Sequence, residues 1–249
     1  MVGGHAVKKE RIDRLLVKKG IVESREQAQL LIAKGVVQVG GRAVLKSSTQ
    51  VQSNAALHLV DAKIAYVSRG GLKLEGALNV LGIDPSNKLV LDVGSSTGGF
   101  TDCLLQRGAA KVFAVDVGYG QLAWRLRKDP RVVCLERINI RYLDPRSLPG
   151  PVDLVTIDVS FISLKKVLFK ILEILKPGGT VLALVKPQFE VGKREVGKGG
   201  IVKERFLHER VIQEITAFSQ SLGFIFLGYT ASLVPGKKGN VEYFIHLRK

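Results

Sequence analysis

The chain has 249 residues, of which 46% are hydrophobic, so it can bury a substantial core and has room for a second, smaller domain. Lys and Arg number 38 against 22 Asp and Glu, and the net charge of +16 favours an acidic polymer as the partner. Short apolar stretches, two cysteines without paired spacing and scattered histidines argue against a membrane span, a secretion signal, a disulfide framework and a metal site, so we expect a cytoplasmic protein without a bound metal.

The first 60 residues predict a small α+β module. Helical periodicity covers residues 11–18 and 24–33. The period then changes to two over residues 36–39, ahead of the tight-turn pair Gly40-Gly41, and we expect a hairpin there.

Basic side chains recur on or beside the two predicted helices, where contacts to phosphate groups are easy to make. These candidate RNA-binding residues are Arg11, Arg14, Lys18, Lys19, Arg25 and Lys34. The alternative is an ordinary solvated basic face. After a further strand-like run at 55–60, we place the module at 8–61, an interdomain linker at 62–71 and a second domain at 72–249.

The second domain begins with a strand followed by a glycine-rich loop. Residues 89–102, LVLDVGSSTGGFTD, lead from an apolar strand through Gly94, Gly98 and Gly99 into a helix. Glycines let the backbone approach a ligand closely, and a helix N-terminus offers free N–H groups. The G-x-G-x-x-G pattern of dinucleotide sites and the G-K-[ST] pattern of phosphate loops are both missing, which favours S-adenosylmethionine over those ligands. The alternative is an ordinary strand-to-helix turn with a glycine-tolerant loop.

A second apolar strand, 111–115, ends in Asp116, where an acid typically holds ribose hydroxyls. The expected cofactor-binding residues are Asp92, Gly94, Ser95, Ser96, Thr97, Gly98, Gly99, Phe100, Asp116, Val117, Asn139 and Asp158. Strands are expected near Leu89, Val112, Val132, Leu154, Val181, Phe224 and Glu242. We therefore predict an α/β fold, a class I, Rossmann-like methyltransferase sheet with helices on both faces and an antiparallel final pair of strands.

Charged residues follow several of these strands. Asp158 ends the apolar run 154–157 and Lys186 follows 181–185, so both should reach the sheet edge at which open α/β sheets bind ligands. The strand end at Asp158 lacks the Pro-Pro pair typical of exocyclic-amine methylation, and neither Cys103 nor Cys134 lies on a loop that suits a nucleophile. A hydroxyl group is the better methyl acceptor.

Residues 11–41 resemble the RNA-binding module named after the fourth protein of the small ribosomal subunit. Six further motifs, in order and at matching intervals, resemble the hemolysin-like TlyA family of ribosomal RNA 2′-O-methyltransferases. They are YVSRGGLKLEGAL at 66–78, LDVGSSTGGF at 91–100, DVGYGQLAW at 116–124, DVSFISL at 158–164, LVKPQFEVGK at 184–193 and GNVEYF at 239–244. The resemblance implies a cytidine ribose as acceptor, in large-subunit RNA, with the small subunit as a further substrate to be tested.

The resemblance also implies a Lys-Asp-Lys-Glu catalytic set at Lys73, Asp158, Lys186 and Glu242. Lys186 would accept the proton of the 2′-hydroxyl or orient that group, and Asp158 would hold the lysine amine. Lys73 and Glu242 would position and tune them. Burial or a second cation lowers the pKa of a lysine, which suits this task.

The basic, glycine-rich segment 191–203 predicts a mobile loop that closes over RNA, with an ordinary disordered loop as the alternative. Arg69, Lys193 and Arg194 complete the candidate RNA-binding residues. We expect ribosomal RNA in ribosomal subunits as partner, no stable membrane association, and no particular oligomeric state. Two other functions stay open, a membrane-active hemolysin-like protein and a non-catalytic RNA-binding protein on a methyltransferase fold.

Overall fold

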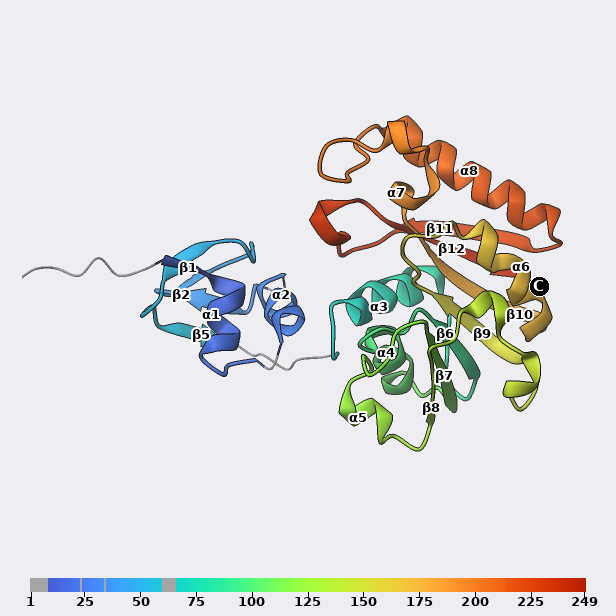
Figure 1. Cartoon of the computed structure of the whole chain (residues 1–249), viewed down its shortest axis with the longest axis horizontal. Helices are drawn as coiled ribbons and strands as arrows, with labels where there is room; N and C mark the ends of the chain where they lie inside the picture. Colours follow the sequence, from blue (N-terminus) through green and yellow to red (C-terminus); the bar gives the residue numbers. More distant parts are fainter. Residues whose placement is uncertain (1–8, 23, 34, 60–65) are drawn as a thin grey trace, which may run out of the picture. The chain divides into compact units, whose positions relative to one another are not determined.

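Two compact units make up the computed structural model, which describes residues 9–22, 24–33, 35–59 and 66–249 (Figure 1). The first unit extends to Arg69 and the second comprises Gly70–Lys249. Helix α3 (Gly70–Leu81) already includes Gly70 and Gly71, so the second unit begins two residues before the position expected from sequence. Residues 62–65 of the expected linker lie outside the described residues.

The first unit combines two helices with short strands. Its elements are β1 (Lys9–Arg11), α1 (Ile12–Lys18), α2 (Arg25–Ala33), β2 (Val37–Val39), β3 (Arg42–Ala43), β4 (Gln50–Gln52) and β5 (Leu57–Leu59). Both predicted helices are confirmed, and the Ser24 hydroxyl accepts a hydrogen bond from the Gln27 N–H at 3.2 Å, as an N-cap does. The predicted hairpin is confirmed as β2–β3, with Gly40 and Gly41 at φ +56° and +76°, which glycine adopts without strain.

The two helices enclose a small core of their own. Apolar residues three and four positions apart place Ile12, Leu15 and Leu16 of α1 on one face, and Leu31 and Ile32 of α2 complete the cluster. Strand β2 pairs with β3 and β5, whereas β1 pairs with β4, and neither β1 nor β4 was expected from the sequence. The first unit therefore has the hydrophobic cluster that a separate domain needs.

The second unit is built on a sheet of seven strands. They are β6 (Leu89–Val93), β7 (Lys111–Asp116), β8 (Val132–Glu136), β9 (Val152–Ile157), β10 (Leu175–Val185), β11 (Ile225–Ala231) and β12 (Tyr243–Arg248). Their order is β11-β12-β10-β9-β6-β7-β8, and β12 runs antiparallel to both of its neighbours. This confirms the predicted class of sheet and its antiparallel final pair. The strand order reverses between β6 and β9, which is where such sheets bind ligands.

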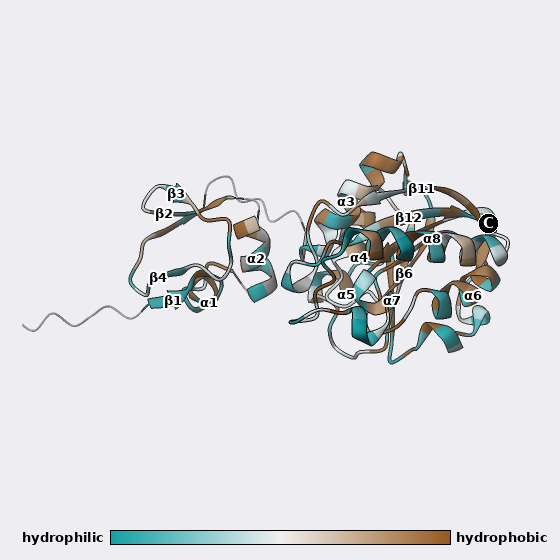
Figure 2. Ribbon diagram, turned by 90° about the horizontal axis from the view of Figure 1, so that it is seen from above, coloured by the Kyte–Doolittle hydropathy of each residue, from teal (hydrophilic) through white to brown (hydrophobic). Residues whose placement is uncertain are grey.

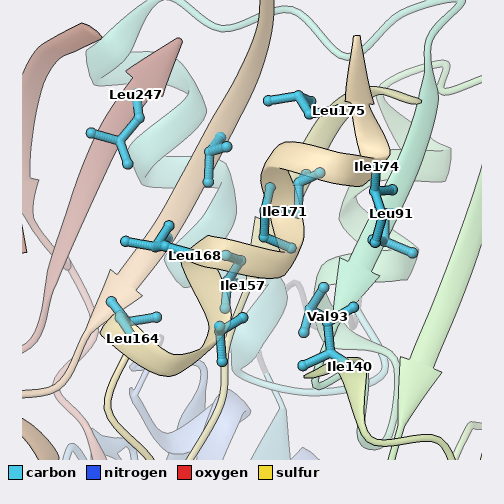
Figure 3. Packing of buried hydrophobic residues seen from close by; sticks show 14 of the residues in the cluster. Leu91, Val93, Ile140, Ile157, Leu164, Leu168, Ile171, Ile174, Leu175 and Leu247 are labelled. Atoms are coloured by element: carbon cyan, nitrogen blue, oxygen red, sulfur yellow. The ribbon is translucent and has the colours of Figure 1, made fainter. Parts of the chain in front are cut away.

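Helices cover both faces of this sheet. The helices that follow α3 are α4 (Gly99–Gln106), α5 (Trp124–Arg127), α6 (Lys165–Ile174), α7 (Pro187–Glu190) and α8 (Arg205–Ser221). Their hydrophilic and hydrophobic sides are visible in Figure 2. On one face, Leu168 and Ile171 of α6 pack against Leu91 and Ile157 of the sheet (Figure 3). On the other, Phe100 of α4 contacts Phe244 of β12, with ring centroids 5.9 Å apart.

Within the described ranges there are also four 3-10 helices, namely η1 (Ile140–Tyr142), η2 (Pro145–Ser147), η3 (Lys193–Glu195) and η4 (Lys237–Gly239). Among the residues that the structure describes, no helix combines the length and the apolar character needed to cross a membrane.

Candidate active site

Four charged residues from distant parts of the sequence meet at the carboxyl edge of the parallel strands. Asp158 directly follows β9 and Lys186 directly follows β10. Strand β12 runs the other way, so Glu242 precedes its first residue at this same edge. The register pairs Val185 with Tyr243, which places Lys186 and Glu242 at the next position along the two chains.

The four side chains form two ion pairs. Lys186 Nζ lies 2.5 Å from Asp158 Oδ1 and donates a hydrogen bond to Ser160 Oγ at 2.9 Å. Lys73, in the first turns of α3, donates to Glu242 Oε2 at 2.5 Å. Both lysines and Glu242 are buried and Asp158 is half-buried. Separating the partners of such a pair leaves a buried charge uncompensated, which is costly. Each ion pair therefore holds its two side chains in place.

The glycine-rich loop is locked onto the same edge. Gly94 has φ +82°, and a Cβ atom there would lie 2.4 Å from the Asp158 carbonyl oxygen. The Gly94 N–H donates to Val115 O at 2.8 Å, and the Asp158 N–H donates to Val93 O at 2.8 Å. Only a residue without a side chain fits this position, and its backbone conformation is one that glycine adopts readily. The start of the loop and the backbone of Asp158 are therefore packed directly against each other.

Asp116 organises the loop from the neighbouring strand. Its Oδ2 accepts from the Ser96 N–H at 2.8 Å and its Oδ1 from the Gly118 N–H at 2.7 Å. Ser96 is exposed with φ +48°, and Val117 is also exposed. The acid predicted to hold ribose hydroxyls thus stands beside the loop, as expected, and its carboxylate now binds backbone N–H groups.

Two residues that we expected to bind the cofactor, Asp92 and Phe100, have buried side chains. Asp92 is fully buried, and its two carboxylate oxygens accept from Thr101 at 2.6 Å and Thr156 at 3.0 Å. Burial raises the pKa of Asp92 to about 6. Phe100 is buried against Phe244. Both support the loop from beneath, because the strand and helix that carry them turn these side chains inward.

The remaining expected cofactor residues lie on the loop or beside it. Ser95 and Gly98 are buried and Thr97 is half-buried. At Gly98, φ is +96° and a Cβ atom would meet the side chain of Leu126 at 2.3 Å. Asn139 accepts from the Arg141 N–H at 3.2 Å and so caps η1. Their contacts to a cofactor stay predictions.

Comparison with known proteins agrees with this geometry. The family described as FtsJ-like methyltransferase matches residues 66–249, and the S4 domain matches residues 10–57. A Mycobacterium tuberculosis protein named 16S/23S rRNA (cytidine-2′-O)-methyltransferase TlyA is 49% identical to this chain, over 97% of this chain and 90% of its own. The chain belongs to the TlyA family of FtsJ-like methyltransferases.

Other members of the TlyA family carry another name. Hemolysin A of Brachyspira hyodysenteriae is 40% identical, over 95% of this chain and 98% of its own. A solved structure from Streptococcus thermophilus, also described under the hemolysins, superposes with a TM-score of 0.76 at 45% identity and covers 98% of this chain and 90% of its own. The resemblance noted from the sequence motifs is thereby confirmed.

The loop after β9 in this methyltransferase domain carries site residues that were not predicted from the sequence. Ser160 contacts Lys186, and Phe161 is 90% exposed with φ +65°, a conformation that is costly for a bulky residue. Its ring lies 5.0 Å from that of Phe189. The sequence did offer a signal for Phe161, since it stands three residues after Asp158. The pattern typical of exocyclic-amine methylation also has an aromatic residue at that distance from its first residue.

Glu190 was also missed and fastens this loop to α7. It accepts from Ser163 Oγ at 2.6 Å and from the Leu164 N–H at 2.8 Å, and burial raises its pKa. No sequence pattern marks such a carboxylate, because its partners are contributed by a segment 26 residues away.

In the S4 domain, two of the candidate RNA-binding residues are organised by a buried acid. Asp13 is fully buried and pairs with Arg11 at 3.0 Å and Arg25 at 2.8 Å. These hydrogen bonds and charges outweigh the effect of burial and lower the pKa of Asp13 to about 2. Both arginines remain partly exposed, so the acid orients them without covering them.

The other candidates differ in their surroundings. Lys18 pairs with Glu10 at 3.2 Å, Lys19 donates to Ala55 O at 2.9 Å, and Arg14 is exposed. Arg11, Arg14 and Lys18 together line a cavity of about 360 Å³. Lys193 and Arg194 lie exposed in η3 and Arg69 is half-buried. Lys34 lies outside the described residues. Binding of RNA by these side chains stays a prediction.

Proposed function

We propose that this protein transfers a methyl group from S-adenosylmethionine to the 2′-hydroxyl of a cytidine in ribosomal RNA, in the large subunit, with the small subunit as a second substrate. The observation that carries the proposal is the pair of ion pairs, Lys186–Asp158 and Lys73–Glu242, at the edge where the glycine-rich loop ends. The names of two relatives, which specify cytidine 2′-O-methylation of rRNA, support cytidine as the target nucleotide and ribosomal RNA as the substrate.

The loop fits the cofactor that this family uses. When bound, S-adenosylmethionine supplies an electrophilic methyl group on a sulfonium. The tight turn at Gly94 and the N-terminus of α4 leave backbone close to a ligand, and Asp116 offers a carboxylate to ribose hydroxyls. Exposed Ser96 and Val117 border this place.

Residues of the chain itself bind and orient the 2′-hydroxyl that accepts the methyl group. Lys186 orients the 2′-hydroxyl and, as the free amine, takes the hydroxyl proton, while Asp158 and Ser160 hold the lysine Nζ in place. The pair of Lys73 and Glu242 lies beside Lys186, because Glu242 precedes the strand that is paired with the one before this lysine. The exposed ring of Phe161 offers a flat surface on which a base can stack.

The S4 domain supplies RNA affinity by the same proposal, because its arginines are held ready for phosphate groups and the chain carries a net charge of +16. Ribosomal subunits are the natural partner. Since ribosomes work in the cytoplasm, the proposal also places the protein there.

The deciding experiment uses tritiated S-adenosylmethionine with separated, unmodified small and large ribosomal subunits. Sites of 2′-O-methylation are then mapped by blocked alkaline cleavage. Label at a cytidine ribose supports the proposal and identifies the subunit. If the protein binds the cofactor but labels neither the subunits nor deproteinised RNA, the non-catalytic alternative is favoured. Leakage of liposomes in its presence would favour a membrane-active protein.

Replacing Lys186 tests its role directly. We expect Lys186→Ala to lower kcat by about 10²- to 10⁴-fold, because proton transfer and positioning are both lost. Affinity for S-adenosylmethionine, measured by calorimetry, should stay close to wild type. The matched control is Lys166→Ala, an exposed lysine on α6, which should retain full activity. Turnover that survives Lys186→Ala would remove this residue from the mechanism.

A further inference from the structure

The basic segment between α7 and α8 is fastened to the turn that precedes Glu242. Asn240 is 3% exposed, its Oδ1 accepts from the Val202 N–H at 3.1 Å, and its Nδ2 donates to Gly200 O at 2.9 Å. His208 is 5% exposed and donates from Nε2 to Val202 O at 2.9 Å, since a carbonyl oxygen can only accept. Buried side chains thus hold both backbone groups of Val202.

Tyr243 fixes the ring of His208. Nδ1 of this ring lies 3.0 Å from the Tyr243 hydroxyl, at hydrogen-bond distance. The two rings meet edge-on, with centroids 5.8 Å apart. Tyr243 directly follows Glu242, so one strand end carries both the acid of the site and an anchor of the basic segment.

The two fastened stretches, residues 197–203 and 236–240, are here named the clasped loops. Both lie at the same end of the sheet, in orange and red in Figure 1. Lys198, Lys203 and Lys238 are exposed, and within the described part of the chain none of them pairs with a carboxylate. Lys238 has φ +63° and its Nζ reaches the space beside Gly200, so the two loops bring their positive charge together.

One of the clasped loops, 236–240, also lies against the carboxylate of Glu242. At Gly236 a Cβ atom would lie 2.1 Å from Glu242 Oε1, and the Gly236 N–H donates to Asn240 O at 2.8 Å. The turn therefore begins against Glu242 and ends at the residue that fastens the basic segment. This arrangement makes the clasped loops one wall of the site.

We propose that the clasped loops bind the phosphate backbone of the RNA beside the target nucleotide, with Asn240 and His208 as positioning residues that hold this basic surface next to Glu242. The inference rests on the proposed methylation of RNA. Glycine-rich backbone is flexible, so its lysines reach a defined phosphate only when buried bonds fix the loop. Phosphate contacts set register and orientation and weaken with salt.

The charge is tested with the triple variant Lys198→Gln, Lys203→Gln and Lys238→Gln. With deproteinised ribosomal RNA, we expect the KM for RNA to rise about 10-fold or more. The negative slope of log(kcat/KM) against log salt should become shallower by about 2, since each phosphate contact contributes about 0.7 to 0.9 to its steepness. The kcat and the affinity for S-adenosylmethionine should stay within about twofold of wild type.

A matched control removes three positive charges from the opposite edge of the sheet, in the variant Lys88→Gln, Lys111→Gln and Arg248→Gln. It should leave the KM close to wild type. Equal effects of the two triple variants would show that net charge alone matters and would overturn the proposal. A wild-type protein that methylates no RNA would instead contradict the proposed function, so the two failures can be told apart.

The clasp is tested with Asn240→Leu and His208→Phe, which keep every lysine. We expect a higher KM for RNA with little change in kcat. Trypsin should newly cleave at Lys198 or Lys203, while the unfolding temperature of the unit Gly70–Lys249 stays unchanged. His208→Gln retains a donor for Val202 O, so its KM for RNA should lie closer to that of wild type than the KM of His208→Phe. Lower kcat at unchanged KM would assign Asn240 to the placement of Glu242 and overturn the proposal, as would wild-type KM and resistance to trypsin.

Discussion

At the scale of single residues, the buried carboxyl of Asp92 makes stability depend on pH. Burial raises its pKa from 3.8 to about 6, so the folded state binds the proton more tightly than the unfolded state. Stability from this residue is therefore present at low pH and is lost as the pH rises through about 6. Between pH 5 and 7 the loss is on the order of 1 kcal/mol.

Asn in place of Asp92 removes this dependence, because an amide does not ionise in this range. Urea denaturation at pH 5 and pH 7 should show the stability of Asp92→Asn, relative to wild type, rising by that amount. The hydroxyls of Thr101 and Thr156 can rotate to suit the amide, so the fold persists. A constant difference between the two proteins would mean that Asp92 is ionised throughout.

Individual residues were predictable where a strand end fixes them. Asp158 and Lys186 follow apolar runs, and that alone places them at one edge of the sheet. The pairing of Lys73 with Glu242 joins residues 169 positions apart, so only the family resemblance could suggest it. The burial of Asp92 and Phe100 was missed, because a motif identifies a loop and does not say which way each side chain points.

At the scale of elements, the turn between β6 and α4 has no room for a side chain at Gly94. We expect Gly94→Ala to weaken binding of S-adenosylmethionine by at least about 10-fold and to lower stability by about 1–3 kcal/mol, since the new Cβ would press on the Asp158 carbonyl oxygen. Calorimetric titration and thermal unfolding measure the two effects.

Gly108 provides the matched control for this turn. It has the same φ of +82°, but the nearest atom to an added Cβ is Ser86 Cβ at 3.5 Å. Gly108→Ala therefore carries the backbone strain without the collision and should bind the cofactor normally. If both variants lose the cofactor equally, strain alone explains the loss and the close approach at Gly94 is irrelevant.

Elements were predictable in proportion to their length and periodicity. The seven strands of the sheet lie where apolar runs place them, and Gly40-Gly41 identified the hairpin. Strands β1 and β4 have three residues each and pair across 39 or more positions, as in Lys9 with Gln52 and Arg11 with Gln50. Such short stretches carry no period, so their partners decide whether they become strands.

At the scale of the whole molecule, each unit has its own hydrophobic cluster and can therefore unfold separately. Leu16 is fully buried in the first unit, and Leu16→Ala should destabilise that unit by about 2–5 kcal/mol. Leu168→Ala in the second unit is the counterpart. Differential scanning calorimetry should show each substitution moving one transition and leaving the other in place.

The variant Leu16→Ala also separates the binding of RNA from the methyl transfer reaction. Loss of the S4 domain in Leu16→Ala should raise the KM for ribosomal RNA and leave cofactor affinity unchanged, because the glycine-rich loop belongs entirely to Gly70–Lys249. At saturating RNA, kcat should approach that of wild type. A single transition that shifts as a whole would show that the units unfold together, and a fall in cofactor affinity would show that the first unit contributes to the site.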